Sequence, residues 1–383
     1  MLPIYIRLIF NRSVKRFQNP FRINVIHYNS LLKGSFVCLS TMPKPKLYIT
    51  RPDVPEEGIA MLQDKFEIKM WPGKSPVPRE ELIKQVKGVD ALFCYLTDKI
   101  DEQVLESAGP SLKVIGTMSV GYDHINVSQL KKKGIKLGIT PDVLTDAVAE
   151  LSVGLLLATS RRLFEAHQEI LKAGSEPLSS SQFNVDSSVV CMTIRDRAGT
   201  GQRGQVGLQN STVGVVGLGR IGQEIVKRLK PFKVTRFLYC GRSDKTEARE
   251  IGVSRVSLDE LLAHSDFVIV TCALTPDTKE MFNDSLFEKM KSSAIFINVS
   301  RGGVVDQFAL QRALESKRIL AAGLDVMTPE PLPPKHPLLQ LSNCVILPHI
   351  GSATIQARKD MALLTVKNII AGVSGTPMPA PLC

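Results

Sequence analysis

Three ionisable side chains, Arg301, Glu330 and His349, each follow an apolar run in the last quarter of the chain. An arginine can hold a carboxylate and can stabilise negative charge that grows on a carbonyl oxygen. A histidine can give that oxygen a proton, and a carboxylate can keep the imidazole oriented. Each residue alone has a plainer explanation: a surface ion pair, a capping acid or a loop histidine. Together, they suit the reduction of a 2-keto acid.

A glycine-rich turn, "VGLGRIG" (216–222), lies between an apolar run and a helical pattern. Gly217 permits a tight turn, Gly219 lets the backbone approach a pyrophosphate, and Gly222 lets the helix pack on the strand. The free amides at the helix N-terminus would hold the phosphates. The pattern GxGxxG alone is weak, but between a strand and a helix it predicts a dinucleotide-binding site.

The next apolar run ends in "LYCGRS" (238–243), without the acid that commonly binds the ribose hydroxyls of NAD. Gly241 leaves room at this position. Arg242 can bind a phosphate, and Ser243 can donate one more hydrogen bond. An exposed loop arginine is the plainer alternative. We expect a pocket for a 2′-phosphate, with NADPH or NADP as the cofactor and NADH bound more weakly.

These residues need a scaffold in which strands end at one edge. In the first part of the chain, the expected strands are 46–50, 91–96, 112–118 and 135–139, and the expected helices are 78–86 and 126–134. In the second part, the expected strands are 212–217, 236–240, 267–274, 294–300, 320–327 and 343–349, and the expected helices are 222–232, 257–265, 306–317 and 356–372. This alternation predicts an α/β protein with two Rossmann-like, doubly wound parallel-sheet domains that flank an active-site cleft.

The domain boundaries follow from the elements. We assign 46–145 together with 353–383 to a substrate domain, and 146–352 to an NADP-binding domain. A helix over roughly 146–171 has a continuous leucine-rich face, which predicts a buried connector between the domains. The last helix would cross back to the first domain.

The net charge of +11 comes mostly from the N-terminal part of the chain. Residues 1–46 contain eight Lys and Arg and no acid, which leaves 40 basic against 37 acidic side chains in the remainder. We therefore expect no nucleic-acid partner. Residues 1–41 are expected to be disordered, as a mitochondrial presequence or as an extension before Met42. The expected location is cytoplasmic, or mitochondrial if these residues are a true presequence.

Other classes of protein receive little support. No apolar run reaches the roughly 18 residues that span a bilayer, so no membrane association is expected. The seven cysteines are scattered and form no metal-binding pattern, which predicts reduced thiols and no metal.

The sequence resembles the D-isomer-specific 2-hydroxyacid dehydrogenases over about 46–173 and 209–380. The most specific pieces are "TMSVGYDHI", "TPDVLTD", "VGLGRIGQ", "FLYCGR", "FINVSRG", "AAGLDV", "PEPLP" and "ILPHIGSAT". The resemblance implies two lobes, a homodimer and a small 2-keto or 2-hydroxy acid as substrate. The expected activity is NADPH-linked reduction of glyoxylate and hydroxypyruvate.

The resemblance also assigns roles to residues. Arg301 would bind the substrate carboxylate and carbonyl, and Glu330 would pair with His349, the acid/base. The backbone amides of Ser119, Val120 and Gly121 would face the substrate carboxylate. The cofactor-binding set expected here comprises Gly217, Gly219, Arg220, Ile221, Gly222, Gly241, Arg242, Ser243, Ala273, Val299, Asp325 and Gly351.

Residues 174–208 depart from the resemblance. Relatives carry a tryptophan-containing stretch of the dimer interface here, whereas the only tryptophan of this chain is Trp71. The stretch is rich in Ser, Gly, Gln and Arg and has no sustained period, so we expect it to be exposed and mobile. Dimer assembly and the substrate pocket are where this replacement should act, more than cofactor binding.

Two alternatives remain at this stage. One is an NAD(H)-sensing binding protein, like the corepressors that share this fold and the Arg/Glu/His set. The other is an NAD-linked dehydrogenase of the same fold, such as one acting on phosphoglycerate. The sequence "CGR" argues against the first, because those corepressors carry an acid at that strand end.

Overall fold

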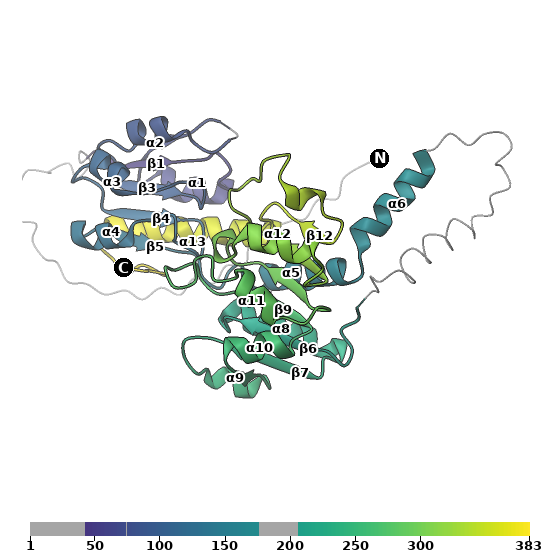
Figure 1. The fold of residues 1–383 in the computed structure, drawn as a ribbon. Coiled ribbons are helices and arrows are strands. Elements are labelled where there is room, and N and C mark those ends of the chain that lie inside the picture. Colours follow the sequence, from purple (N-terminus) through teal and green to yellow (C-terminus); the bar gives the residue numbers. More distant parts are fainter. Residues whose placement is uncertain (1–42, 74, 176–205) are drawn as a thin grey trace, which may run out of the picture. The chain divides into compact units, whose positions relative to one another are not determined.

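The computed structural model describes residues 43–73, 75–175 and 206–383. The predictions for 1–41, and those for 174–208 beyond its two ends, therefore lie outside the described residues. Residues Lys44–Cys383 form one compact unit. It contains two sheets in which every strand pair is parallel (Figure 1), as predicted.

The first sheet has the strand order β2-β1-β3-β4-β5. Its strands are β1 (Lys46–Ile49), β2 (Glu67–Met70), β3 (Ala91–Cys94), β4 (Val114–Thr117) and β5 (Lys136–Gly138). The helices in this part are α1 (Glu56–Gln63), α2 (Arg79–Gln85), α3 (Glu102–Ala108) and α4 (Val127–Lys133). Every residue of β3 and β4 is buried, which is why both strands read as continuous apolar runs.

The second sheet has the order β12-β11-β10-β9-β6-β7-β8. Its strands are β6 (Thr212–Val216), β7 (Arg236–Cys240), β8 (Ser254–Arg255), β9 (Phe267–Val270), β10 (Ile295–Asn298), β11 (Ala321–Leu324) and β12 (Cys344–Ile346). The helices are α8 (Arg220–Leu229), α9 (Thr246–Glu250), α10 (Leu258–His264), α11 (Asp284–Lys289) and α12 (Gln307–Glu315), with short 3₁₀ turns η1 (Lys230–Phe232), η2 (Gly302–Val304) and η3 (Pro337–Gln340). The strand order reverses beside β6, and such a switch point is where open α/β sheets bind ligands.

The long helix predicted over 146–171 is two helices, α5 (Thr145–Ser160) and α6 (Leu163–Ser175). The helix breaks at Arg161 and Arg162, where Arg162 has a left-handed backbone with φ of 53°. α5 packs against α8, β10, β11 and β12, so it is buried as predicted, and its role as a connector between domains stays a prediction. For α6 the prediction of burial is wrong. Its apolar side chains Leu163, Phe164, Ile170 and Leu171 are all exposed.

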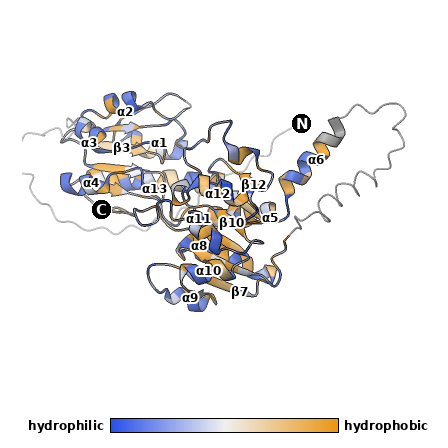
Figure 2. Cartoon of the chain, viewed as in Figure 1, coloured by the Kyte–Doolittle hydropathy of each residue, from blue (hydrophilic) through white to orange (hydrophobic). Residues whose placement is uncertain are grey.

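One buried hydrophobic cluster runs from the first sheet through α5 to the second, and each sheet has a further cluster on one of its faces. Hydrophobic residues follow the strands of both sheets, and the helices turn hydrophilic faces outward (Figure 2). The final helix, α13 (Ile355–Ser374), packs against β3, β4, β5 and α1 and thus returns to the first sheet. The domain boundaries at 145/146 and 352/353 stay a prediction.

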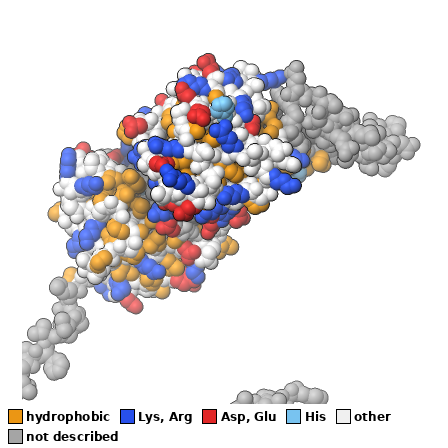
Figure 3. Space-filling model, turned by 90° about the horizontal axis from the view of Figure 1, so that it is seen from below, with side chains coloured by type: hydrophobic (Ala, Val, Ile, Leu, Met, Phe, Trp, Pro, Cys, Tyr) orange, Lys and Arg blue, Asp and Glu red, His pale blue; other side chains and the backbone are white. Residues whose placement is uncertain are grey.

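The surface carries both signs of charge. On the face drawn in Figure 3, acidic side chains lie among the basic ones. No helix within the described ranges is both long enough and apolar enough to cross a membrane.

Candidate functional site

A cavity of about 440 Å³ lies where loops from both sheets meet. Its size falls within the range of about 300–1,000 Å³ that is usual for small-molecule sites. Ten of the predicted site residues line it: Ser119, Val120, Gly121, Ile221, Ala273, Val299, Arg301, Asp325, His349 and Gly351. A second hollow, of about 730 Å³, lies between α6 and the edge strand β12 and contains none of them.

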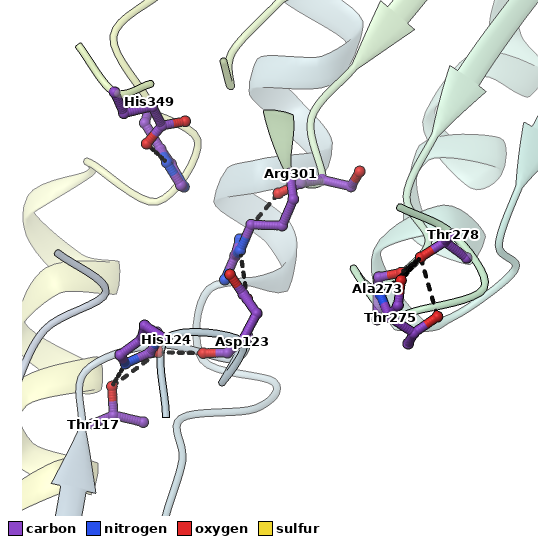
Figure 4. A network of polar contacts seen from close by, with 12 residues as sticks. Thr117, Asp123, His124, Ala273, Thr275, Thr278, Arg301 and His349 are labelled. Carbon is purple, nitrogen blue, oxygen red and sulfur yellow. Dashed lines mark hydrogen bonds and ion pairs between the residues drawn. The ribbon is translucent and has the colours of Figure 1, made fainter. Parts of the chain in front are cut away.

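Arg301 follows β10 and reaches across to the loop after β4 (Figure 4). Its Nε donates to Asp123 Oδ1 at 2.9 Å, and its Nη1 donates to the Ser300 carbonyl at 2.9 Å. The Asn298 side chain fixes the Arg301 backbone by donating to its carbonyl at 2.9 Å. Burial raises the pKa of Asp123, but the charge and hydrogen bond of Arg301 lower it more, so this carboxyl titrates below its usual range. The Asp123 carboxylate is therefore ionised at neutral pH.

His349 follows β12 and is paired with Glu330, as predicted. Its Nδ1 lies 2.9 Å from Glu330 Oε2, and Glu330 Oε1 accepts from the Met327 amide at 3.0 Å. Burial raises the pKa of Glu330, yet the hydrogen bond and charge of His349 outweigh it and leave the pKa below its usual value. An ionised Glu330 accepts a hydrogen bond from His349 Nδ1–H, which leaves Nε2 as the atom that can exchange a proton with a substrate.

The backbone at His349 is held in an unusual conformation. Its φ is 55°, in the left-handed region that residues other than glycine seldom adopt. Asp325, at the end of β11, accepts from the amides of Ile350 and Gly351, both at 2.8 Å. Asp325 was predicted to bind cofactor. In the structure its buried carboxylate supports the histidine loop, although the residue also lines the cavity.

The loop 119–121 is fixed by a chain of side-chain hydrogen bonds. Ser119 Oγ donates to the Gly121 carbonyl at 2.6 Å, so it accepts from Thr117 Oγ1 at 3.0 Å. Thr117 has then used its only proton and must accept from His124 Nε2 at 3.0 Å. This chain assigns the Nε2–H tautomer to His124. It also occupies the Ser119 hydroxyl within the loop, so the groups of this loop that stay candidates for the substrate are its backbone amides.

The glycine turn fits a dinucleotide for steric reasons. At Gly217, where φ is 99°, a Cβ would lie 2.8 Å from the Cys272 backbone. A Cβ on Gly222 would lie 2.6 Å from the Gly217 carbonyl, whereas one on Gly219 would meet nothing. Gly219 therefore faces open space directly before α8, where a pyrophosphate could approach the helix N-terminus. The Arg220 side chain is paired with Asp142 at 2.6 Å.

The loop 241–243 follows β7, and the neighbouring strand β8 brings a further arginine to it. A Cβ on Gly241 would come no closer than 3.9 Å to the Tyr239 ring, so this position has room. Arg255 Nη2 donates to the Gly241 carbonyl at 3.1 Å. Arg242 and Ser243 are exposed. None of these residues lines the cavity, which is linked to the nucleotide turn through Ile221.

Sequence reasoning missed four residues here: Asp123, His124, Thr117 and Arg255. The first three lie inside the quoted motif "TMSVGYDHI", directly beside the loop that was singled out. Arg255 lies in a two-residue strand that no pattern revealed. In the loop after β9, the Ala273 carbonyl accepts from Thr278 Oγ1 at 2.7 Å, and Ala273 lines the cavity (Figure 4).

Among the described residues, no group of three or more His, Cys, Asp or Glu could hold a metal ion. The described cysteines are free thiols.

Comparison with known proteins gives consistent results. The model of the NAD binding domain of the D-isomer specific 2-hydroxyacid dehydrogenases matches residues 153–351. The mouse glyoxylate reductase/hydroxypyruvate reductase is 49% identical over 340 residues, which cover 88% of this chain and 97% of that protein. The human protein of the same name is 48% identical over 343 residues, with the same coverage.

Solved structures agree with the fold. The TT0316 protein from Thermus thermophilus superposes with a TM-score of 0.76 at 35% identity, over 88% of this chain and all of that one. An NADPH-dependent glyoxylate/hydroxypyruvate reductase from Sinorhizobium meliloti, in complex with NADP and malonate, gives a TM-score of 0.72 at 28% identity. That match covers 89% of this chain and 97% of the bacterial one.

Proposed function

The chain belongs to the D-isomer specific 2-hydroxyacid dehydrogenases, and from this premise we propose that it reduces glyoxylate to glycolate and hydroxypyruvate to D-glycerate with NADPH. The observation that carries the proposal is the meeting of Arg301, the 119–121 loop and the His349–Glu330 pair at one cavity. The names of the mammalian relatives support the choice of substrates.

The residues of this chain act on the carboxylate and the carbonyl of the substrate. Arg301 and the amides at 120–121 bind the carboxylate, which fixes the carbonyl beside His349. When bound, a reduced nicotinamide supplies the hydride. Arg301 stabilises the negative charge on the carbonyl oxygen, and His349 gives that oxygen its Nε2 proton. Glu330 holds the imidazole so that Nε2 faces the substrate.

The cofactor would lie along the nucleotide turn. Gly219 leaves open space for a pyrophosphate before α8, the tightly packed Gly217 and Gly222 shape the turn, and Ile221 lies at the boundary to the cavity. The room at Gly241 and the exposed side chains of Arg242 and Ser243 favour a 2′-phosphate and hence NADPH over NADH. The complex of the bacterial relative with NADP supports this choice.

The test of the activity is a rate measurement on the purified full chain. Glyoxylate and hydroxypyruvate are each mixed with NADPH or NADH, and the absorbance of the reduced cofactor is followed. We expect turnover of both acids, faster with NADPH. Binding of NADH without turnover would favour a nucleotide-sensing protein, and turnover of a phosphoglycerate with NAD would favour the other alternative.

The test of the cofactor site is the double variant Gly241→Asp/Arg242→Ala. It should lose its preference for NADPH, because the new carboxylate repels a 2′-phosphate and binds ribose hydroxyls. Arg249→Ala is the matched control, since this arginine is also exposed and lies in the adjacent helix α9. An unchanged ratio of NADPH to NADH rates in the double variant would refute the assignment of this loop.

We propose a homodimer that forms through α6. Leu163, Phe164, Ile170 and Leu171 are each more than half exposed on this helix, and the hollow beside β12 adjoins it. Exposed apolar patches of this kind mark interaction surfaces. Phe164→Glu combined with Leu171→Glu should shift the chain to monomers in light scattering. Phe308→Glu, on α12 and 66% exposed, is the control and should leave the mass unchanged.

The proposed location is cytoplasmic, with mitochondrial import as the alternative if residues 1–41 act as a presequence. The composition of these residues, basic and free of acid, motivates the alternative. Fluorescent fusions of the full chain and of a chain that starts at Met42 distinguish the two. Mitochondrial signal from the full chain alone would establish import.

A further inference from the structure

The arginine that binds substrate in the proposed function is itself bound by an acid from the opposite sheet. Asp123 lies in the loop after β4, and Arg301 lies 178 residues later in the loop after β10. Their side chains are 28% and 21% exposed, so the pair is partly shielded from water. Figure 4 shows the Asp123 carboxylate against the Arg301 guanidinium, on the side away from His349.

The hydrogen bonds around Arg301 define which edge of the guanidinium is free. A guanidinium has five N–H groups. Nε–H is used by Asp123, and one Nη1–H is used by the Ser300 carbonyl. The other three, at the outer end of Nη1 and on Nη2, have no partner among the described residues. They form the flat edge that binds a carboxylate through two parallel hydrogen bonds.

Gly121 shows where this free edge lies. A Cβ built on Gly121 would overlap Arg301 Nη2. The guanidinium therefore rests directly on the loop whose amides are candidates for the substrate carboxylate. The hydrogen-bond chain from His124 through Thr117 and Ser119 to the Gly121 carbonyl holds that loop in place.

We propose that Asp123 is a positioning residue for the reduction, which fixes the Arg301 guanidinium so that its outer edge faces the substrate carboxylate beside Gly121. Asp123 keeps its bond to Nε while substrate is bound, because the substrate uses the opposite edge. The inference rests on the proposed function. It adds that substrate affinity depends on an acid that does not touch the substrate.

The same contact permits a contrary role, in which Asp123 competes with the substrate for Arg301. The two roles predict opposite changes in substrate affinity. If Asp123 competes, removal of its charge tightens substrate binding. If Asp123 positions Arg301, removal of its charge frees the guanidinium to rotate and weakens binding.

The experiment measures kcat and KM for glyoxylate, and the Kd for NADPH, in Asp123→Asn and Asp123→Glu of the full chain. Both variants should raise KM about tenfold or more and lower kcat less, at unchanged Kd for NADPH. Asp123→Glu keeps the negative charge but moves it by one methylene. A raised KM in this variant therefore shows that the position of the carboxylate matters, and not its charge alone. Asp284→Asn is the matched control, because Asp284 pairs with Arg312 in an exposed ion pair away from the cavity. It should change none of the three values.

A double-mutant cycle with Arg301→Lys tests whether Asp123 acts through Arg301. Lysine lacks the planar fork that Asp123 would orient. Asp123→Asn should therefore cost much less in kcat/KM when lysine is at position 301. A lowered KM in Asp123→Asn, a wild-type KM in both Asp123 variants, or additive losses in the cycle would each overturn the proposal. If the wild-type chain itself does not reduce glyoxylate, the proposed function fails first and separately.

Discussion

The nucleotide end and the substrate end of the site differ in the groups that form them. The pyrophosphate turn of the nucleotide end is backbone: three glycines within six residues, two of which have no space for a Cβ. The substrate end is a set of two side-chain pairs between loops: Asp123 with Arg301, 178 residues apart, and Glu330 with His349, 19 residues apart. The backbone end should govern cofactor affinity, and the paired side chains should govern substrate affinity and proton transfer. Variants at one end should leave the function of the other unchanged.

Arg301→Ala should show the largest difference between the effect on substrate turnover and the effect on cofactor affinity. In the proposed function, the variant loses the group that binds the substrate carboxylate and the charge that stabilises the developing oxyanion, so kcat/KM for glyoxylate should fall by about 10³-fold. The Kd for NADPH, from quenching of intrinsic fluorescence or from calorimetry, should stay at the wild-type value. Arg312→Ala, which removes an exposed arginine of α12, is the control. An equal loss of NADPH affinity in Arg301→Ala would contradict the claim that the two ends of the site act independently.

Glu330→Gln should have a smaller effect at the same end. The amide can still accept from Met327 but is a poorer partner for His349 Nδ1, so the imidazole loses its fixed tautomer. We expect kcat to fall roughly tenfold or more, which is part of the factor of about 10²–10⁴ that a positioned general acid supplies. KM should change less than kcat. A variant with wild-type kcat would show that the pairing is dispensable.

Two glycine variants sharpen the account of the nucleotide end. Gly219→Ala places its Cβ in open space, so the melting temperature should be unchanged while the Kd for NADPH rises about tenfold, equivalent to ~1.4 kcal/mol. Gly222→Ala forces its Cβ against the Gly217 carbonyl and should lower both stability and cofactor affinity. If Gly219→Ala binds NADPH normally, the cofactor does not approach the turn at this residue.

The smallest effect concerns stability in acid. Burial lowers the pKa of His124 to about 4. The folded state thus binds this proton less readily than the unfolded chain, whose histidine titrates near 6.5. The contribution of neutral His124 to the free energy of unfolding is fully present above pH 6.5. It is lost as the pH falls toward 4, which lowers the free energy of unfolding by up to about 3 kcal/mol. In His124→Gln, the melting temperature should fall less steeply over this window. If the melting temperature of His124→Gln falls as steeply as that of the wild type, a group other than His124 causes the sensitivity to acid.

The two ends also differ in what the sequence could predict. The glycine turn is local, so its spacing between a strand and a helix identified it without a structure. Arg301, Glu330 and His349 were found because each follows a strand, and the ends of parallel strands meet at one edge. The partner of Arg301 could not be found this way, because Asp123 comes from the other sheet and pairing between sheets leaves no periodic signal.

Weak local patterns explain the other misses. β2 lies at an edge and alternates exposed with half-buried residues, so "EIKM" does not read as a buried strand. Arg255 reaches the 241–243 loop only because the short β8 pairs with β7. The helix breaks after α5 at Arg161 and Arg162, and no glycine or proline there would have predicted the break.

The most direct test of the account is the turnover of glyoxylate by His349→Asn at saturating NADPH, measured beside the Kd for NADPH. Asparagine keeps a polar group of similar size but supplies no proton, so kcat should fall by about 10²–10⁴-fold while the Kd is unchanged. His264→Asn, an exposed histidine of α10, should behave as wild type. Near-normal turnover in His349→Asn would contradict the claim that this residue is the proton donor.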